Sequence, residues 1–194
     1  MRLLGLLAGV LAIGMYFPYI RDILRKTTQP HRASWLIWSV LGLIAFFSQY
    51  AEGATDSLWM TGAQTLGTVV VLALSLKFGT EGFSALDRIS LLAAIFGVVW
   101  WYFTRNAVYA LLITIAVDVI SAGLTAKKAY ALPESETMST WILSATSSVF
   151  GTLAVGSFNP VLMVYPFYVF LASSGVILAI IFGRRKAIRS YAGV

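Results

Sequence analysis

The chain has 194 residues, of which 59% are hydrophobic and only 11% are charged, and its mean hydropathy is +0.83. Soluble domains carry about 25% charged residues, so this composition excludes an ordinary soluble protein and indicates a single-domain membrane protein. The sequence contains no cysteine, which excludes disulfides, thiolate metal sites and cysteine nucleophiles. The formal net charge is +6, and the positions of the basic residues explain it.

Apolar runs bounded by charged or turn residues predict seven membrane helices, because about 20 helical residues cross about 30 Å of hydrocarbon. In chain order these helices cover residues 3–20, 33–51, 57–78, 89–103, 107–126, 138–156 and 161–182. The first run follows Arg2 and could be mistaken for a cleaved signal peptide. It is too long for a typical signal peptide and leads into a basic loop, so we expect it to be a membrane helix of the protein. The predicted fold class is therefore an all-α membrane protein with seven transmembrane helices.

Basic residues are distributed unequally between the two sides of this arrangement. Twelve of the fourteen fall on one side: Arg21, Arg25, Lys26, Arg32, Lys77, Arg88, Lys127, Lys128, Arg184, Arg185, Lys186 and Arg189. Because cytoplasmic loops carry the excess of lysine and arginine, we predict an N-terminus outside and a C-terminus in the cytosol, in a plasma membrane of bacterial type. The same rule explains the basic tail beside the last helix, so we predict no nucleic-acid partner.

The chain matches itself at an offset of 106 residues. ASWLI at 33–37 falls on STWIL at 139–143, and VVLAL at 70–74 falls on VILAI at 176–180. A single helix between two copies gives both copies the same direction in the membrane, which is the parallel-repeat arrangement. We therefore predict a 3+1+3 organisation: a first three-helix repeat (1–78), a linker helix with its loops (79–106), a second repeat (107–184) and a basic cytosolic tail (185–194).

This plan and two matching segments carry a family resemblance. FPYIRDILRKTTQPHRASWLIW at 17–38 combines a proline near the inner helix end, a basic loop and a Ser-Trp helix start, and GLTAKKAYALPESETMSTWIL at 123–143 has the same layout. Over nearly the whole chain the sequence resembles the PQ-loop superfamily, which includes the SWEET sugar transporters. The signature dipeptide is Pro18-Tyr19 in the first copy and Leu124-Thr125 in the second. The resemblance implies that Pro18 acts as a hinge and that the second copy lacks one.

One carboxylate, Asp118, lies at the centre of the apolar run LLITIAVDVISAGL. An aspartate at the centre of a membrane helix costs about 2.5 to 3.5 kcal/mol, so it needs partners. Thr114, Ser121 and Thr125 share its helix face, and we expect this face to turn toward polar residues on the third or sixth helix. At the repeat offset its counterpart is Ala12, so the acid belongs to one half only. Asp118 is predicted to bind substrate or exchange a proton; the alternative is a structural lock between helices.

Further polar and aromatic residues are predicted to line a substrate site with Asp118. They are Trp38 and Ser39 on the second helix, Gln64 and Thr68 on the third, Ser144 and Ser148 on the sixth, and Thr114 and Ser121 on the fifth. A few polar groups among apolar surfaces are typical of a small-molecule site. In the alternative interpretation, each hydroxyl bonds to the carbonyl one turn back and small residues only permit close helix packing.

The function we predict is alternating-access transport of a small polar solute: a sugar, amino acid, amine or vitamin precursor, with proton coupling through Asp118 left open. A non-transporting seven-helix receptor or scaffold is the alternative. A retinal protein is not expected, because no lysine falls in the interior of a predicted helix: Lys77, Lys127 and Lys128 all lie at cytosolic helix ends. Neither is an enzyme: the single histidine, His31, lies in a loop, and no metal-ligand cluster or nucleophile motif appears. We predict no cofactor, and the lipid bilayer as the surroundings; the oligomeric state is open.

Overall fold

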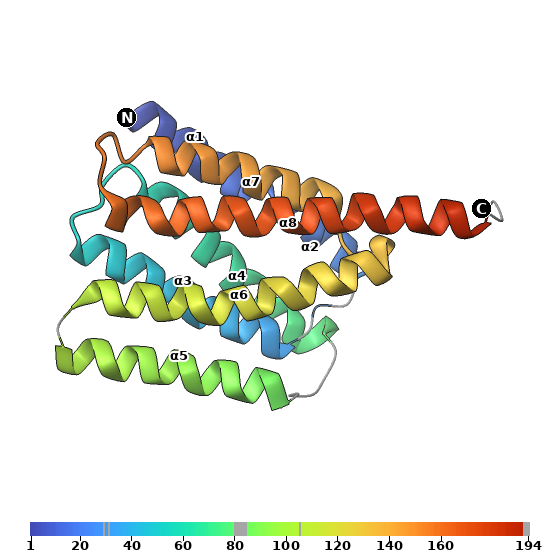
Figure 1. The fold of residues 1–194 in the computed structure, drawn as a ribbon, viewed down its shortest axis with the longest axis horizontal. Helices are drawn as coiled ribbons and strands as arrows, with labels where there is room; N and C mark the ends of the chain where they lie inside the picture. The colour runs from blue at the N-terminus through green and yellow to red at the C-terminus, as the bar shows by residue number, and fades with distance from the viewer. Residues whose placement is uncertain (29, 31, 80–84, 105, 192–194) are drawn as a thin grey trace.

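The protein is a bundle of helices, seen in a computed structural model that describes residues 1–28, 30, 32–79, 85–104 and 106–191. His31 lies outside these residues. The elements are α1 (Arg2–Gly14), α2 (Tyr16–Leu24), α3 (Arg32–Ala51), α4 (Leu58–Phe78), α5 (Ala85–Thr104), α6 (Ala107–Ala131), the short helix η1 (Pro133–Ser135), α7 (Met138–Leu153) and α8 (Pro160–Tyr191). The described residues form no β-strand, and the C-terminal end of α8 projects beyond the other helices (Figure 1).

Five segments are long and apolar enough to cross a membrane, judged by length and composition: Arg2–Leu24, Arg32–Ala51, Leu58–Phe78, Val108–Ala131 and Pro160–Ile188. A shorter apolar stretch, Leu91–Thr104, lies in α5. The predicted sixth helix is α7, which has only 16 residues and many hydroxyl groups. These hydroxyls reduce its hydropathy, but Thr146, Ser148 and Thr152 each donate to the carbonyl one turn back. The described chain is thus an all-helical protein of the integral membrane type.

The first predicted helix is divided into α1 and α2 by a break at Met15. Pro18 causes this break, because a proline has no N–H to donate and its ring clashes with the carbonyl four residues earlier, that of Gly14. A neighbouring helix binds the broken segment, since Thr140 of α7 donates to the carbonyl of Met15 at 3.2 Å. The predicted helix over 3–20 is therefore two helical segments that form one span.

Several helix ends differ from the prediction. The helices α6 and α8 continue to Ala131 and Tyr191, past the predicted ends at 126 and 182. Lysine, arginine and alanine favour helix, so the helix continues after the apolar run ends. Lys127 and Lys128 consequently lie within α6, near its C-terminal end. In the other direction α7 ends at Leu153, three residues early, and Gly156 takes a φ of 76° in the turn that follows.

The order of packing is the same among the first spans and the last. The helix α4 packs against both α1 and α3, and α8 packs against both α6 and α7. The two groups meet through α1 with α7 and through α3 with α6. The helix α5 packs against α6 and α3, at one side of the bundle (Figure 1). The contact of α1 with α7 thus has a counterpart in the contact of α6 with α3, whereas the smaller contact of α4 with α7 has none of comparable size.

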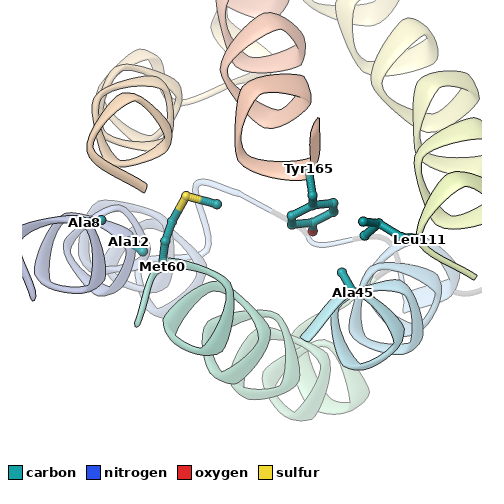
Figure 2. Close-up of a cluster of buried hydrophobic side chains, with 6 residues drawn as sticks. All are labelled: Ala8, Ala12, Ala45, Met60, Leu111 and Tyr165. Carbon is teal, nitrogen blue, oxygen red and sulfur yellow. The ribbon is translucent and has the colours of Figure 1, made fainter. Parts of the chain in front are cut away.

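A cluster of buried side chains closes one end of the bundle. It consists of Ala8, Ala12, Ala45, Met60, Leu111 and Tyr165, which come from α1, α3, α4, α6 and α8 (Figure 2). We call it the outer cluster, because it lies toward the end that we predict to be outside. Met60 contacts Gly151 of α7, and a side chain at that glycine would collide with it. Small residues at these positions let the helices approach closely.

The Tyr16 ring lies directly on α4, at a position where only glycine fits. Tyr16 is 4% exposed and donates from its hydroxyl to the carbonyl of Gln64 at 2.9 Å. A Cβ atom at Gly67 would collide with the ring of Tyr16, whereas a Cβ at Gly175 on α8 would meet nothing within 4 Å. Glycine at position 67 is therefore what allows α2 to contact α4 so closely.

We expect the Gly67→Ala substitution to destabilise the protein by about 1 to 3 kcal/mol, because it overpacks this contact. The unfolding temperature in detergent should fall accordingly. Gly175→Ala is the matched control, since it makes the same substitution in a helix with open space beside it, and it should leave the unfolding temperature unchanged or higher. Equal unfolding temperatures for the two variants would contradict the tight contact between Tyr16 and α4.

Candidate functional site

A cavity of about 380 Å³ lies in the centre of the bundle, between the two groups of helices. Side chains from α2, α3, α4, α6, α7 and α8 line it, and we call it the central cavity. Its deep end is at Gln64, Thr114 and Tyr165, next to the outer cluster. At the other end Lys128 and Glu136 line it, near the ends of helices that carry most basic residues. Its volume falls in the range of small-molecule sites.

Seven of the nine predicted site residues line the central cavity: Trp38, Gln64, Thr68, Thr114, Asp118, Ser121 and Ser144. Ser39 and Ser148 lie outside its walls. Both are buried, and each donates to the carbonyl one turn back, Ser39 to Trp35 and Ser148 to Ser144, at 2.7 Å in both cases. These two hydroxyls therefore follow the alternative interpretation of local hydrogen bonding.

Asp118 is held by two neutral donors from two other helices. The indole Nε1 of Trp38 on α3 donates to Oδ1 at 3.0 Å, and the hydroxyl of Tyr168 on α8 donates to Oδ2 at 3.1 Å. These donors lie on the second and the seventh predicted helices. The polar residues Gln64, Thr68 and Ser144 of the third and sixth line the same cavity but make no hydrogen bond to Asp118. Hydrogen bonds from these donors offset part of the cost of burying the carboxylate. A carboxylate accepts about four hydrogen bonds, so acceptor capacity remains on both oxygens.

Tyr168 is a residue that the sequence analysis missed. It lies in the middle of an apolar helix, where a tyrosine hydroxyl needs a hydrogen-bond partner. A tyrosine in this position could therefore have been recognised in the sequence as a candidate site residue, but the sequence does not show that its partner is Asp118. Tyr168 is not among the residues that line the cavity, whereas Tyr165, one turn earlier, lines it and is 8% exposed.

Four aromatic side chains form one wall of the central cavity, which we call the aromatic wall: Tyr16, Tyr19, Trp35 and Trp38. The ring of Trp35 lies 5.1 Å from that of Tyr19 and 5.1 Å from that of Trp38, centroid to centroid, and 6.4 Å from that of Tyr16. Trp38 meets Trp35 edge to face, at an interplanar angle of 84°. Edge-to-face contacts of this kind stabilise a fixed arrangement of rings.

Several hydroxyl groups around the cavity already donate their protons within the protein. Thr65 and Thr68 donate within α4 and Thr125 donates within α6, to carbonyls three or four residues earlier. Ser144 and Ser173 share one hydrogen bond of 2.9 Å. A hydroxyl that donates its proton still has lone pairs that accept. These walls therefore offer more acceptors than donors.

Two polar groups at the deep end lack protein partners. Thr114 is 1% exposed, and its Oγ1 has no hydrogen-bond partner among the described residues. The side-chain amide of Gln64 makes no hydrogen bond to the described part of the chain, although its backbone carbonyl accepts from Tyr16. Buried polar groups are normally satisfied. The deep end is thus suited to a polar ligand or to water.

An ion pair lies at the opposite end, at the mouth of the cavity. Lys128 Nζ and Glu136 Oε1 are 3.1 Å apart, and the indole Nε1 of Trp141 donates to Oε2 of Glu136 at 3.2 Å. The side chain of Lys128 is 54% exposed, so this end of the cavity reaches solvent. Trp35 lies at the same end, and it corresponds to Trp141 at the repeat offset.

The depth of the cavity can be checked by thiol labelling, because the chain contains no native cysteine. We expect a Ser121→Cys variant to react with a charged, water-soluble methanethiosulfonate reagent, since this position lines the cavity. Ser148→Cys is the matched control, a buried helical serine outside the cavity walls, and it should react at least about tenfold more slowly. Equal reaction rates would mean that the cavity is not water-filled.

Comparison of the chain with protein-family models, curated proteins and solved structures finds no match in any of the three. A functional assignment for this chain therefore depends on the geometry of the central cavity and on the chemistry of its walls.

Proposed function

We propose that this chain transports a small polar solute across a membrane by alternating access. The observation that carries the proposal is the central cavity itself: it reaches solvent at one end, is closed by the outer cluster at the other, and holds an uncompensated carboxylate between the two. A path that is open at one end and closed by removable side-chain packing at the other is what a carrier needs in one of its states. A tightly filled bundle would instead favour a receptor or scaffold.

The proposed architecture is two parallel three-helix repeats, 1–78 and 107–184, joined by α5. Two observations support it. The packing order α1–α4–α3 matches α6–α8–α7, and the contacts between the groups exchange in the same way. Moreover, six pairs of cavity-lining residues are separated by 106 positions: Met15 and Ser121, Tyr16 and Ala122, Tyr19 and Thr125, Ser34 and Thr140, Trp35 and Trp141, and Trp38 and Ser144. A two-fold axis along the membrane normal would then pass through the cavity, as in parallel-repeat transporters.

This arrangement is the one implied by the resemblance to the PQ-loop superfamily, and membership of that superfamily is part of the proposal. The movement would consist of rocking one repeat against the other. Pro18 supplies a break at Met15 that serves as a hinge in the first repeat. The second repeat has its helix-interior proline elsewhere, at Pro166 of α8, so the two halves would move unequally.

The closed end would open by separating Met60 of α4 from Gly151 of α7. Met60 is fully buried, and its side chain is flexible and unbranched, which suits a contact that must form and separate. At the other end, Trp35 and Trp141 are placed to approach each other when the mouth closes. Together, the opening of one end and the closing of the other would expose the cavity first to one side of the membrane and then to the opposite side.

The orientation of the chain follows from its basic residues and is tested by cysteine labelling. We expect Ser157→Cys, in the exposed turn before α8, to react with an impermeant reagent applied to intact cells. Lys186→Cys, on the exposed part of α8, should react only after the membrane is opened. Ser57 is unsuitable for this purpose because it is 2% exposed. The opposite labelling pattern would reverse the proposed orientation.

The role of Asp118 in transport is tested by Asp118→Asn, which preserves shape but cannot ionise. In proteoliposomes we expect this variant to lose accumulation driven by a pH gradient, by at least about tenfold, while equilibrative exchange persists. Asp118→Ala should also destabilise the fold by about 1 to 3 kcal/mol, because the donors on Trp38 and Tyr168 would lose their acceptor.

The assay measures uptake of labelled sugars, amino acids and amines by wild type and by Asp118→Asn, with unfolding temperatures as the folding control. An unchanged rate and pH profile in Asp118→Asn would make the carboxylate a structural lock. Failure of the wild-type protein to move any solute of these classes would favour the receptor or scaffold instead.

A further inference from the structure

The charges on the cavity walls do not balance. Apart from the tyrosines, the described lining residues include three ionisable side chains: the carboxylates of Asp118 and Glu136 and the amine of Lys128. Lys128 and Glu136 form an ion pair at the mouth and compensate each other. Both partners of Asp118 are neutral, so its ionised form leaves one unpaired negative charge inside the cavity. A negative charge at membrane depth is stabilised most by a cation that is desolvated with it.

The hydrogen-bonding capacity of the walls has the same bias. The side chains of Thr65, Thr68 and Thr125 have already donated their protons to carbonyls and retain lone pairs. Asp118 accepts only. The side-chain amide of Gln64 and the hydroxyls of Thr114, Ser121 and Tyr165 donate no hydrogen bond within the described part of the chain. A ligand that mainly donates hydrogen bonds fits these walls, and an ammonium group donates three and accepts none.

The aromatic wall lies beside the carboxylate, because Trp38 belongs to both. Tyr19 and Trp35 continue the wall toward the mouth, with their ring centroids 5.1 Å apart. Faces of tryptophan and tyrosine attract cations and also bury apolar carbon. The wall therefore complements a ligand that carries a positive nitrogen next to hydrocarbon.

We propose that the central cavity binds a small organic amine in its protonated form, with the ammonium group on Asp118 and the hydrocarbon part against the aromatic wall. This inference rests on the proposed transport function and assigns its substrate class. Thr114 and Gln64 then bind a polar substituent at the deep end. A sugar fits less well, because its neutral hydroxyls cannot compensate the charge of Asp118, whereas an ammonium group does.

The test is direct binding to the purified protein in lipid nanodiscs, with two probes of nearly the same shape. One probe is 3,3-dimethylbutylamine, which is charged at neutral pH, and the other is 3,3-dimethylbutan-1-ol, its neutral isostere; glucose is the third ligand. We expect the amine to bind at least about tenfold more tightly than the alcohol, since only the amine pairs with a buried carboxylate. Equal affinities, or tighter binding of glucose, would overturn the inference.

Variants show which groups cause the preference. Asp118→Asn should remove the difference between amine and alcohol, whereas Glu52→Gln, which removes an exposed carboxylate outside the cavity, should leave it intact. Tyr19→Leu should weaken amine binding about threefold or more, and Tyr19→Phe should retain it, because phenylalanine keeps the ring face. The two Tyr19 variants keep the test valid if Asp118→Asn fails to fold. An amine preference that survives in Asp118→Asn would overturn the inference.

The same experiment separates the substrate class from the transport function. If the alcohol or glucose binds as tightly as the amine and wild-type proteoliposomes still take up a solute, the chain is a transporter and the amine assignment is wrong. If the amine binds through Asp118 but no solute is taken up, the site is an amine receptor, and the transport function is wrong while the ligand class stands.

Discussion

The hydrogen bonds to Asp118 are the interaction on which the centre of this structure depends. A carboxylate at this depth is tolerated only with partners, and its two donors come from α3 and α8, on either side of α6. The carboxylate therefore connects α6 to a helix of each three-helix group. It also holds the indole of Trp38 and the hydroxyl of Tyr168 against α6. Asp118 and Trp38 both line the central cavity, so this contact forms part of its wall.

The break at Pro18 connects to the same region by a different route. Proline leaves the carbonyl of Gly14 without its usual helical donor, and Thr140 of α7 donates to the Met15 carbonyl. Thr140 also lines the cavity, so the weakest point of the first span contacts the opposite group of helices at the cavity wall. Ser147 of α7 adds a second such bond, to the carbonyl of Ala8 at 2.8 Å. The segment around the break is thus bonded to the helix that forms the opposite wall of the cavity.

The helical spacing of Thr114, Asp118, Ser121 and Thr125 was sufficient to predict that they line one site, because the geometry of a helix determines which residues share a face. Their partners were not predictable in this way, since Trp38 and Tyr168 reach Asp118 through the packing of separate helices. Ser39 and Ser148 differ from the prediction for a local reason: a serine hydroxyl bonds to its own helix as readily as it faces a cavity. Helix ends differed because hydropathy marks the limits of the apolar segment, whereas lysine and arginine continue the helix beyond it.

The two walls of the cavity differ at positions that correspond in the proposed repeat. Tyr19 is matched by Thr125 and Trp38 by Ser144, so large rings on the first group face small hydroxyls on the second. Asp118 is matched by Ala12, which lies in the outer cluster and not in the cavity. A symmetric pair of walls would bind a ligand equally well in two orientations. The ring faces and the carboxylate meet where Trp38 contacts α6, so under the proposed amine binding a ligand with one charged end and one apolar end would take a single orientation.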